Sequence, residues 1–164
     1  HDGRLAVHAH ASRPRRVLRA RARPMNAEAG SLATLFASSF LSATLLPGNS
    51  EIVLAAVVAN LPHLFWTAIA VATVGNTVGG MTSYALGRLI PAEGGRKLAP
   101  RAVALAQRYG IPMLLLSWVP VIGDALCVAS GWLRQDWRLS TLAIAAGKLV
   151  RYVVVAEGVR RVVS

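Results

Sequence analysis

Charged residues are scarce in this chain of 164 residues, where Asp, Glu, Lys and Arg together make up 15% of the sequence. A soluble globular domain usually carries about a quarter charged residues, so this shortage argues against an ordinary soluble domain. Hydrophobic residues reach 54%, and the mean hydropathy is +0.49. The composition therefore favours a membrane protein, and the length suits one domain.

Cysteine and histidine are also scarce, which removes several kinds of chemistry. Cys127 is the single cysteine, so an internal disulfide is excluded. It lies in an apolar run and no histidine follows His63, so we expect a buried packing residue and not a nucleophile. No His-Glu-x-x-His or paired-aspartate motif accompanies the apolar serines. We therefore expect no enzyme, such as an intramembrane hydrolase, and neither a cofactor nor a metal site.

More than half of the net charge of +11 belongs to an N-terminal tail. Seven of the 18 basic residues lie within residues 1–24, with one acid. The tail has no apolar core of the kind that a signal peptide needs. Arginine clusters bind the phosphates of nucleic acids, but no aromatic residue lies among these arginines. The sequence predicts a disordered basic extension over residues 1–27, and we do not expect nucleic acid as a partner.

Residues 64–87 are the clearest membrane-spanning segment, because they contain no Asp, Glu, Lys, Arg or His. A helix of about 20 apolar residues crosses a bilayer. Small residues recur at every fourth position, which lets helix backbones approach closely in lipid. We expect these residues to pack helices together; they are Gly75, Gly79, Ser83 and Gly87. Asn76, beside this stripe, is a candidate to line a polar cavity.

A second spanning segment is predicted over residues 139–158. It carries Lys148 and Arg151, which are three positions apart and so share one helical face. Basic side chains near a helix end extend to the headgroups. Lys148 lies near the middle of this segment, so a buried partner becomes plausible.

Two further apolar segments, 31–61 and 111–133, are interrupted by proline and glycine in "LLPGNSE" and "VPVIGD". Such motifs break a helix. Each segment is either a broken spanning helix or a re-entrant hairpin, and either form must be buried against protein or line a cavity. The loop between the halves, 88–108, is rich in Arg and Lys, and the positive-inside rule places it in the cytoplasm. The residues leave the choice between crossing and re-entrant forms open.

The interruptions form a weak internal repeat, since "PGNSEIVLAA" and "PVIGDALCVA" carry an acid at the same offset. These acids are Glu51 and Asp124. A charge at the centre of a membrane helix costs about 2.5–3.5 kcal/mol, so we expect both acids to cluster with Lys148 and Arg151. The cluster is either a protonatable site that drives transport or a static network of salt bridges. Asn49, Ser50 and Ser117, at the breaks, are further candidates to line a cavity.

Four stretches, "FLSATLLPGNSE", "GNTVGGMTSYALGR", "RYGIPMLLLSWVPVIGDALCVASGWLR" and "GKLVRYVVVA", together resemble the YqaA-like branch of the DedA membrane-protein family, the VTT or SNARE-associated group. The resemblance covers roughly residues 32–156, nearly the whole chain after the tail. It implies a bacterial inner (plasma) membrane protein over residues 28–164. It also implies an all-α polytopic fold, with two inverted re-entrant units packed with two spanning helices.

The resemblance further implies proton-dependent transport or flipping of lipid, including phospholipids and polyprenyl phosphates. The main branch of the family carries an arginine three residues before and three after the proline of its second re-entrant loop. Ser117 and Gly123 stand there in this chain, so the last helix would have to supply the cation. Membrane lipids, a lipid or small-molecule substrate and protons are the expected partners, and oligomer formation stays open. The alternative is a membrane scaffold or assembly protein whose intramembrane charges are structural.

Overall fold

The computed structural model describes residues 25–43, 49–91, 93–94, 98–119 and 121–163. These residues form helices and no strands, so the prediction of an all-α protein is confirmed. In chain order the elements are α1 (Met25–Ser42), α2 (Asn49–Asn60), η1 (Pro62–Leu64), α3 (Phe65–Leu89), α4 (Pro100–Tyr109), η3 (Ile111–Trp118), α5 (Ile122–Trp132) and α6 (Trp137–Val163).

The two longest helices, α3 and α6, have the length and composition to cross a membrane. At 1.5 Å per residue, the 25 residues of α3 extend about 37 Å, which exceeds the ~30 Å hydrocarbon core of a bilayer. Large apolar side chains are exposed on both helices, as a surface in contact with lipid requires. They include Val74, Val78, Leu86, Leu89, Leu142, Leu149, Val150 and Val154.

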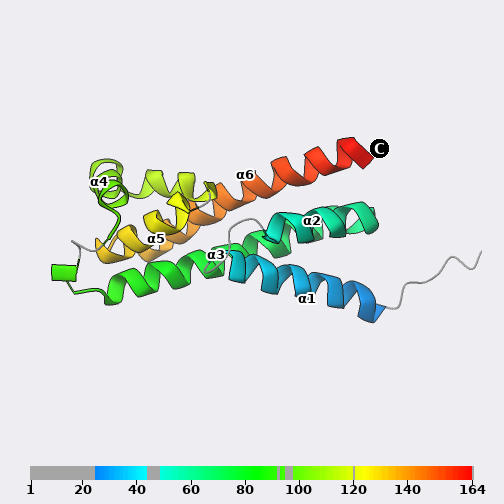
Figure 1. Cartoon of the computed structure of the whole chain (residues 1–164), viewed down its shortest axis with the longest axis horizontal. Helices are drawn as coiled ribbons and strands as arrows, with labels where there is room; N and C mark the ends of the chain where they lie inside the picture. The colour runs from blue at the N-terminus through cyan, green and yellow to red at the C-terminus, as the bar shows by residue number, and fades with distance from the viewer. Residues whose placement is uncertain (1–24, 44–48, 92, 95–97, 120, 164) are drawn as a thin grey trace, which may run out of the picture.

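Two helix pairs point toward each other from opposite ends of these long helices (Figure 1). The start of α1 and the end of α2 lie at the same end of the molecule as the C-terminus. η3 begins near α4, at the other end of the molecule, and α5 ends there. The facing ends of both pairs lie near the middle of the molecule, where α1 ends at Ser42, α2 begins at Asn49, η3 ends at Trp118 and α5 begins at Ile122. α1 and η3 thus end before the two prolines, and α2 and α5 begin after them.

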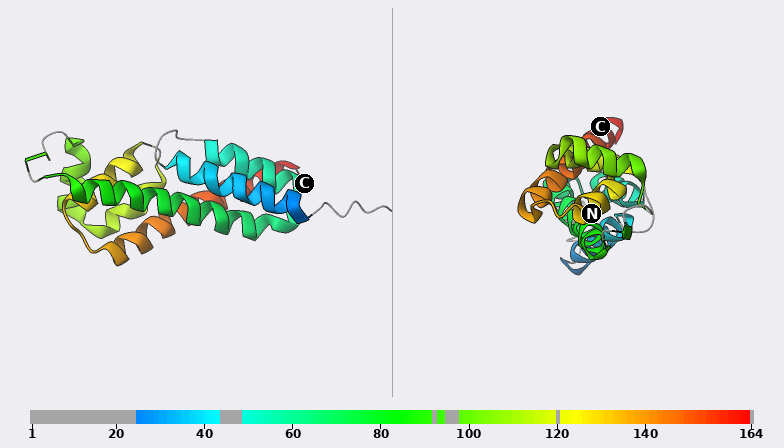
Figure 2. Two further views of the ribbon diagram at one scale, coloured as in Figure 1. Left: turned by 90° about the horizontal axis from the view of Figure 1, so that it is seen from below. Right: turned by 90° about the vertical axis from the view of Figure 1, so that its left-hand side faces the viewer.

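The two halves of the molecule are interlocked. α1 packs on α3 within the first half, while α2 also packs on α6 of the second half. η3 packs on α6, while α5 packs on α3. The two views of Figure 2 show these short elements gathered around the crossing of the two long helices. Each half therefore completes the core of the other.

Small residues permit the closest backbone contacts between these helices. A Cβ atom on Gly75 would lie 2.8 Å from a carbonyl oxygen of α1, and one on Gly79 would lie 2.7 Å from another. Farther along α3, Ser83 is buried, and a Cβ on Gly87 would lie 2.1 Å from a carbonyl oxygen of α5. Gly147 on α6 has the corresponding place against η3, at 2.5 Å. One stripe on α3 thus packs against both helix pairs, α1–α2 and η3–α5, which we call the first and the second broken unit.

Two predicted boundaries differ from the structure. Residues 25–27, assigned to the extension, open α1, while residues 1–24 lie outside the described residues. The predicted basic loop 88–108 contains helix α4. The basic residues of this segment suggested a loop, but the segment also carries a helical pattern. Ala102 and Ala106 are four apart and bury one face of α4, and Gly110, at φ 63°, ends the helix.

Candidate functional site

Arg151 joins the two broken units through its guanidinium group. Its Nε and Nη2 atoms each lie 2.5 Å from Oε1 of Glu51. Its Nη1 donates a hydrogen bond of 3.0 Å to the carbonyl oxygen of Trp118. Glu51 lies in the first turn of α2, where the helix dipole also favours a carboxylate, and Trp118 ends η3. One side chain of α6 therefore contacts the tips of both units.

The second acid has no such contact. Asp124 lies in the first turn of α5, and its Oδ1 is buried without a hydrogen-bond partner among the described residues. Lys148, 3% exposed on α6, and Arg151 both lie within electrostatic range of Asp124. Neither forms a direct ion pair with it in the part of the chain that the structure describes. The four charged residues thus lie in one region. Glu51 and Arg151 form a direct ion pair, while Asp124 and Lys148 interact without direct contact.

A buried polar network lies next to the ion pair. The Tyr152 hydroxyl donates to Oγ of Ser50 at 3.0 Å, and Ser50 in turn donates to Oγ of Ser42 at 3.2 Å. Nδ2 of Asn76 donates to the carbonyl oxygen of Ser39 at 3.0 Å. The side-chain oxygens of Asn76 and Ser39 have no partner among the described residues, and both side chains lie close to Tyr152. Buried oxygens of this kind are usually satisfied by ordered water.

A groove of about 420 Å³ opens beside the ion pair. Glu51 and Arg151 form its polar part, and the rest of its lining is apolar. The apolar lining consists of Trp118, Val150, Val154 and Val155. Val150 and Val154 also belong to the exposed outer face of α6. The groove therefore offers a charged end and an apolar wall that is continuous with the surface that faces lipid.

The four residues predicted to line a cavity lie elsewhere. Asn49 is exposed at the start of α2, and Ser50 and Asn76 belong to the buried network. Ser117 is buried, with Oγ 3.5 Å from the carbonyl oxygen of Ile144. Their position in the sequence, near the breaks or beside the glycine stripe, predicts proximity to a cavity. It does not tell which way a side chain points.

Sequence reasoning missed Tyr152, Ser39 and Ser42. A signal was present for the two serines, since residues three apart share one face of a helix. Tyr152 adjoins Arg151 in the sequence, which could also have drawn notice. The carbonyl of Trp118 had no signal, because side-chain types do not show which backbone groups a break leaves free.

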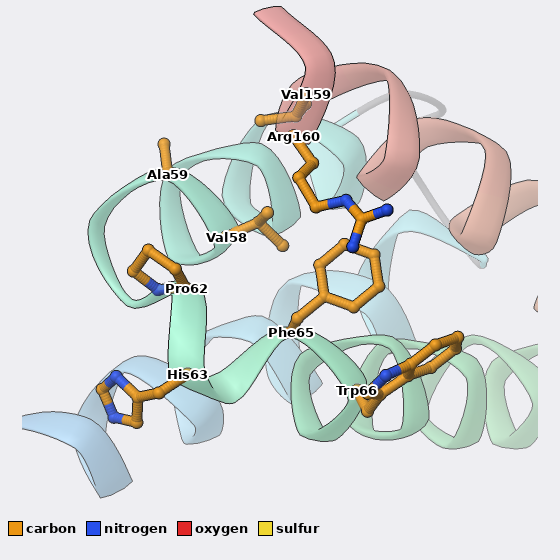
Figure 3. Close-up of a pocket in the computed structure, with 8 residues that line it drawn as sticks. All are labelled: Val58, Ala59, Pro62, His63, Phe65, Trp66, Val159 and Arg160. Atoms are coloured by element: carbon orange, nitrogen blue, oxygen red, sulfur yellow. The ribbon is translucent and has the colours of Figure 1, made fainter. Parts of the chain in front are cut away.

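A second hollow, of about 390 Å³, lies where α2 leads into α3 (Figure 3). The guanidinium of Arg160 lies 5.3 Å from the centre of the Phe65 ring, and it also pairs with Glu157 at 2.9 Å. His63 pairs with Glu28 at 3.2 Å. This hollow lies at an end of the bundle and does not touch the breaks. The groove beside Glu51 is therefore the better candidate for the functional site.

Comparison with known proteins decides the family. Over 129 residues, the chain is 48% identical to "Inner membrane protein YqaA" of Escherichia coli (strain K12), covering 79% of this chain and 91% of that protein. The chain belongs to the YqaA family. The YqaA protein of Shigella flexneri gives the same identity and coverage. An uncharacterized protein of Haemophilus influenzae is 43% identical over 139 residues, which cover 77% of this chain and 85% of that protein.

Membership of the YqaA family confirms the resemblance found in the sequence and places the chain in a bacterial inner membrane. No family model matches the chain, and no solved structure matches it. The exposed apolar side chains of α3 and α6 agree with this location. The names of the YqaA relatives give a location and no activity.

Proposed function

We propose that this protein is a proton-coupled transporter or lipid flippase, in which α1–α2 and η3–α5 are re-entrant units of an inverted repeat. The observation that carries the proposal is the Glu51–Arg151 ion pair at the edge of an open groove, where the tips of both units meet. Many secondary transporters bind substrate at broken helices near the midplane, between inverted repeats.

The contacts of Arg151 support an exchange in which the guanidinium binds either Glu51 or an anionic substrate. While Glu51 is ionised, it occupies the guanidinium and holds α2 to α6. Proton uptake by Glu51 removes that ion pair and frees the guanidinium for an anionic group in the groove. Deprotonation reverses the exchange and expels the anion. Because Arg151 also holds the carbonyl of Trp118, the exchange acts on both broken units at once.

The groove suits an amphipathic anion such as a phospholipid or a polyprenyl phosphate. An arginine fork binds phosphate oxygens in pairs, and the valines of α6 provide an apolar path for the chain. Asp124, with its unpartnered oxygen, and Lys148 form the second acid–base pair that a return step needs.

The re-entrant form has a direct test in the membrane. Reporter tags inserted after Gly94 and after the C-terminus are expected on opposite sides, because only α6 crosses the membrane between them. Broken segments that cross would place both tags on the same side. That result would rule out the re-entrant units and leave the question of transport open.

Transport is tested in proteoliposomes that contain a fluorescent phospholipid and carry a pH gradient. We expect wild type to move the lipid, and Glu51→Gln and Asp124→Asn to abolish its dependence on the gradient. Glu157→Gln is the matched control, because it removes an acid of α6 whose partners are Arg160 and Arg161 at the end of the bundle. Gradient-dependent movement that survives in both acid variants would refute the proton role.

A membrane scaffold is the second candidate, since the same ion pair also links α2, η3 and α6 mechanically. It predicts no movement of lipid by wild type, together with loss of folding in Glu51→Gln. Measuring folding and transport on the same samples separates the two functions.

A further inference from the structure

Among the described residues, basic side chains are paired with acids at one end of the bundle but not at the other. At the end that holds the C-terminus, Arg160 and Arg161 pair with Glu157, and His63 pairs with Glu28. At the opposite end, five exposed arginines form no ion pair with any carboxylate of the described residues. They are Arg88, Arg101, Arg108, Arg134 and Arg138, and we call them the arginine belt.

Helix α4 carries two members of the arginine belt and lies across the bundle. It is seen nearly end-on in Figure 1 and side-on in the right view of Figure 2, so it runs roughly perpendicular to the long helices. Arg101 and Arg108 are seven residues apart and share its exposed face, while Ala102 and Ala106 bury the opposite face. A helix perpendicular to the spanning helices runs parallel to the membrane surface.

Aromatic rings accompany the arginine belt. The guanidinium of Arg108 lies 5.2 Å from the centre of the Tyr109 ring, and that of Arg138 lies 5.4 Å from the Trp137 ring. Tyr109 and Trp137 are more than half exposed. Exposed Trp and Tyr favour the level of the lipid headgroups, so these arginines lie at the height of the phosphates.

The local acids do not neutralise this end. Asp136 accepts hydrogen bonds of 2.9 Å from the backbone N–H groups of Arg138 and Leu139, and so caps α6. Glu93 is exposed and forms no ion pair within the described ranges. Five arginines against two acids leave a surplus of positive charge that an anionic partner would balance.

We propose that the arginine belt is a binding surface for anionic phospholipid headgroups, organised by α4. It takes a ring of lipids from its own leaflet and thereby fixes the depth of this end of the bundle. The belt lies at the end of the molecule opposite Arg160, away from the groove, so the proposal does not depend on transport. A phosphate of the bilayer is the fitting occupant, because the arginines lie on α4 and at the neighbouring ends of α3, α5 and α6, two of them beside aromatic rings.

The test uses the full-length protein in a neutral detergent, titrated with phosphatidylglycerol and followed by native mass spectrometry. Each basic residue near a lipid surface contributes about a fivefold gain in affinity at low salt. Replacing two of them, in Arg101→Gln/Arg108→Gln, is therefore expected to weaken binding about 25-fold. Arg160→Gln/Arg161→Gln, at the other end, is the matched control and should keep wild-type affinity. Phosphatidylcholine should bind all three proteins weakly and alike.

The double variant Arg101→Lys/Arg108→Lys keeps the charge but changes the shape of the side chains, and it should retain most of the affinity. It also controls for folding, because it changes the same two positions. Equal loss in the two glutamine doubles, or no loss in either, would overturn the assignment to α4. Tighter binding of a short oligonucleotide than of phosphatidylglycerol would overturn the choice of lipid. Competition by free phosphate at the lipid's own concentration would do the same, because it would show that the arginines bind the anion without regard to the lipid that carries it.

Discussion

The two broken units carry an acid at the same offset from a proline, but they hold that acid differently. Glu51 of the first unit contacts Arg151 through two guanidinium nitrogens. Asp124 of the second unit has a buried oxygen without a hydrogen bond in the described structure. The two units therefore carry their acids at the same offset but differ in how these acids are paired, with Arg151 in contact with Glu51 alone of the two.

The units also differ in what attaches them to the long helices. The tip of the first unit is tied to α6 by the ion pair and by the hydrogen bond from Tyr152 to Ser50. The second unit is attached to α3 at a crossing of backbones, where a Cβ on Gly131 would lie 1.9 Å from the carbonyl oxygen of Tyr84. The first unit also meets α3 at close backbone contacts, through α1 at Gly75 and Gly79. What distinguishes the first unit is its additional ion pair with α6, which a proton or a ligand could exchange.

The largest effect on stability is expected from Arg151→Gln. It leaves Glu51 and the Trp118 carbonyl without their cation. Breaking a buried ion pair from one side costs about 3–5 kcal/mol. Glu51 is a third exposed, which places the loss near the lower bound. The free energy of unfolding in mixed detergent micelles, followed by tryptophan fluorescence, measures it.

Lys148→Met is the matched control on the same helix. It removes a buried cation that forms no direct ion pair with a carboxylate among the described residues. The loss of free energy of unfolding in Lys148→Met should be well below the loss in Arg151→Gln. A Lys148 variant that is destabilised as strongly as the Arg151 variant would show that the two acid–base pairs are equivalent.

The next largest effect concerns the steric attachment of the second unit. Gly131→Ala forces the backbones of α3 and α5 apart, and overpacking of this kind costs about 1–3 kcal/mol. Gly158→Ala on α6 meets nothing within 4 Å and should be neutral or slightly stabilising. The same unfolding titration compares them, and a tolerated Gly131→Ala would show that this crossing does not hold α5 to α3.

Sequence reasoning reached the fold further than the site. The long apolar segments, the breaks at the prolines and the four-residue stripe on α3 follow from residue type and spacing alone. Helix α4 was missed because its charges suggested a loop, although its small buried residues recur at helical spacing. The pairing of Arg151 with Glu51 and not Asp124 depends on how α2 and α5 pack on α6, which no local pattern determines.

A smaller effect is expected from Tyr152→Phe. The change removes the hydrogen bond that ties α6 to Ser50 but keeps the buried ring. A hydrogen bond of this kind contributes about 1 kcal/mol, and the unfolding titration should show that loss. If the hydroxyl also fixes the tip of α2, the transport rate should change while Tyr84→Phe, at the other end of α3, leaves it unchanged. Equal rates in both tyrosine variants would confine Tyr152 to packing.

The smallest effect on stability is expected from Asp124→Asn. The substitution keeps the shape of a side chain that has no direct ion pair in the described residues, so the free energy of unfolding should fall only slightly. Glu51→Gln leaves Arg151 without its carboxylate and should cost clearly more. Comparable losses in the two variants would mean that Asp124 is held by a cation as firmly as Glu51 is.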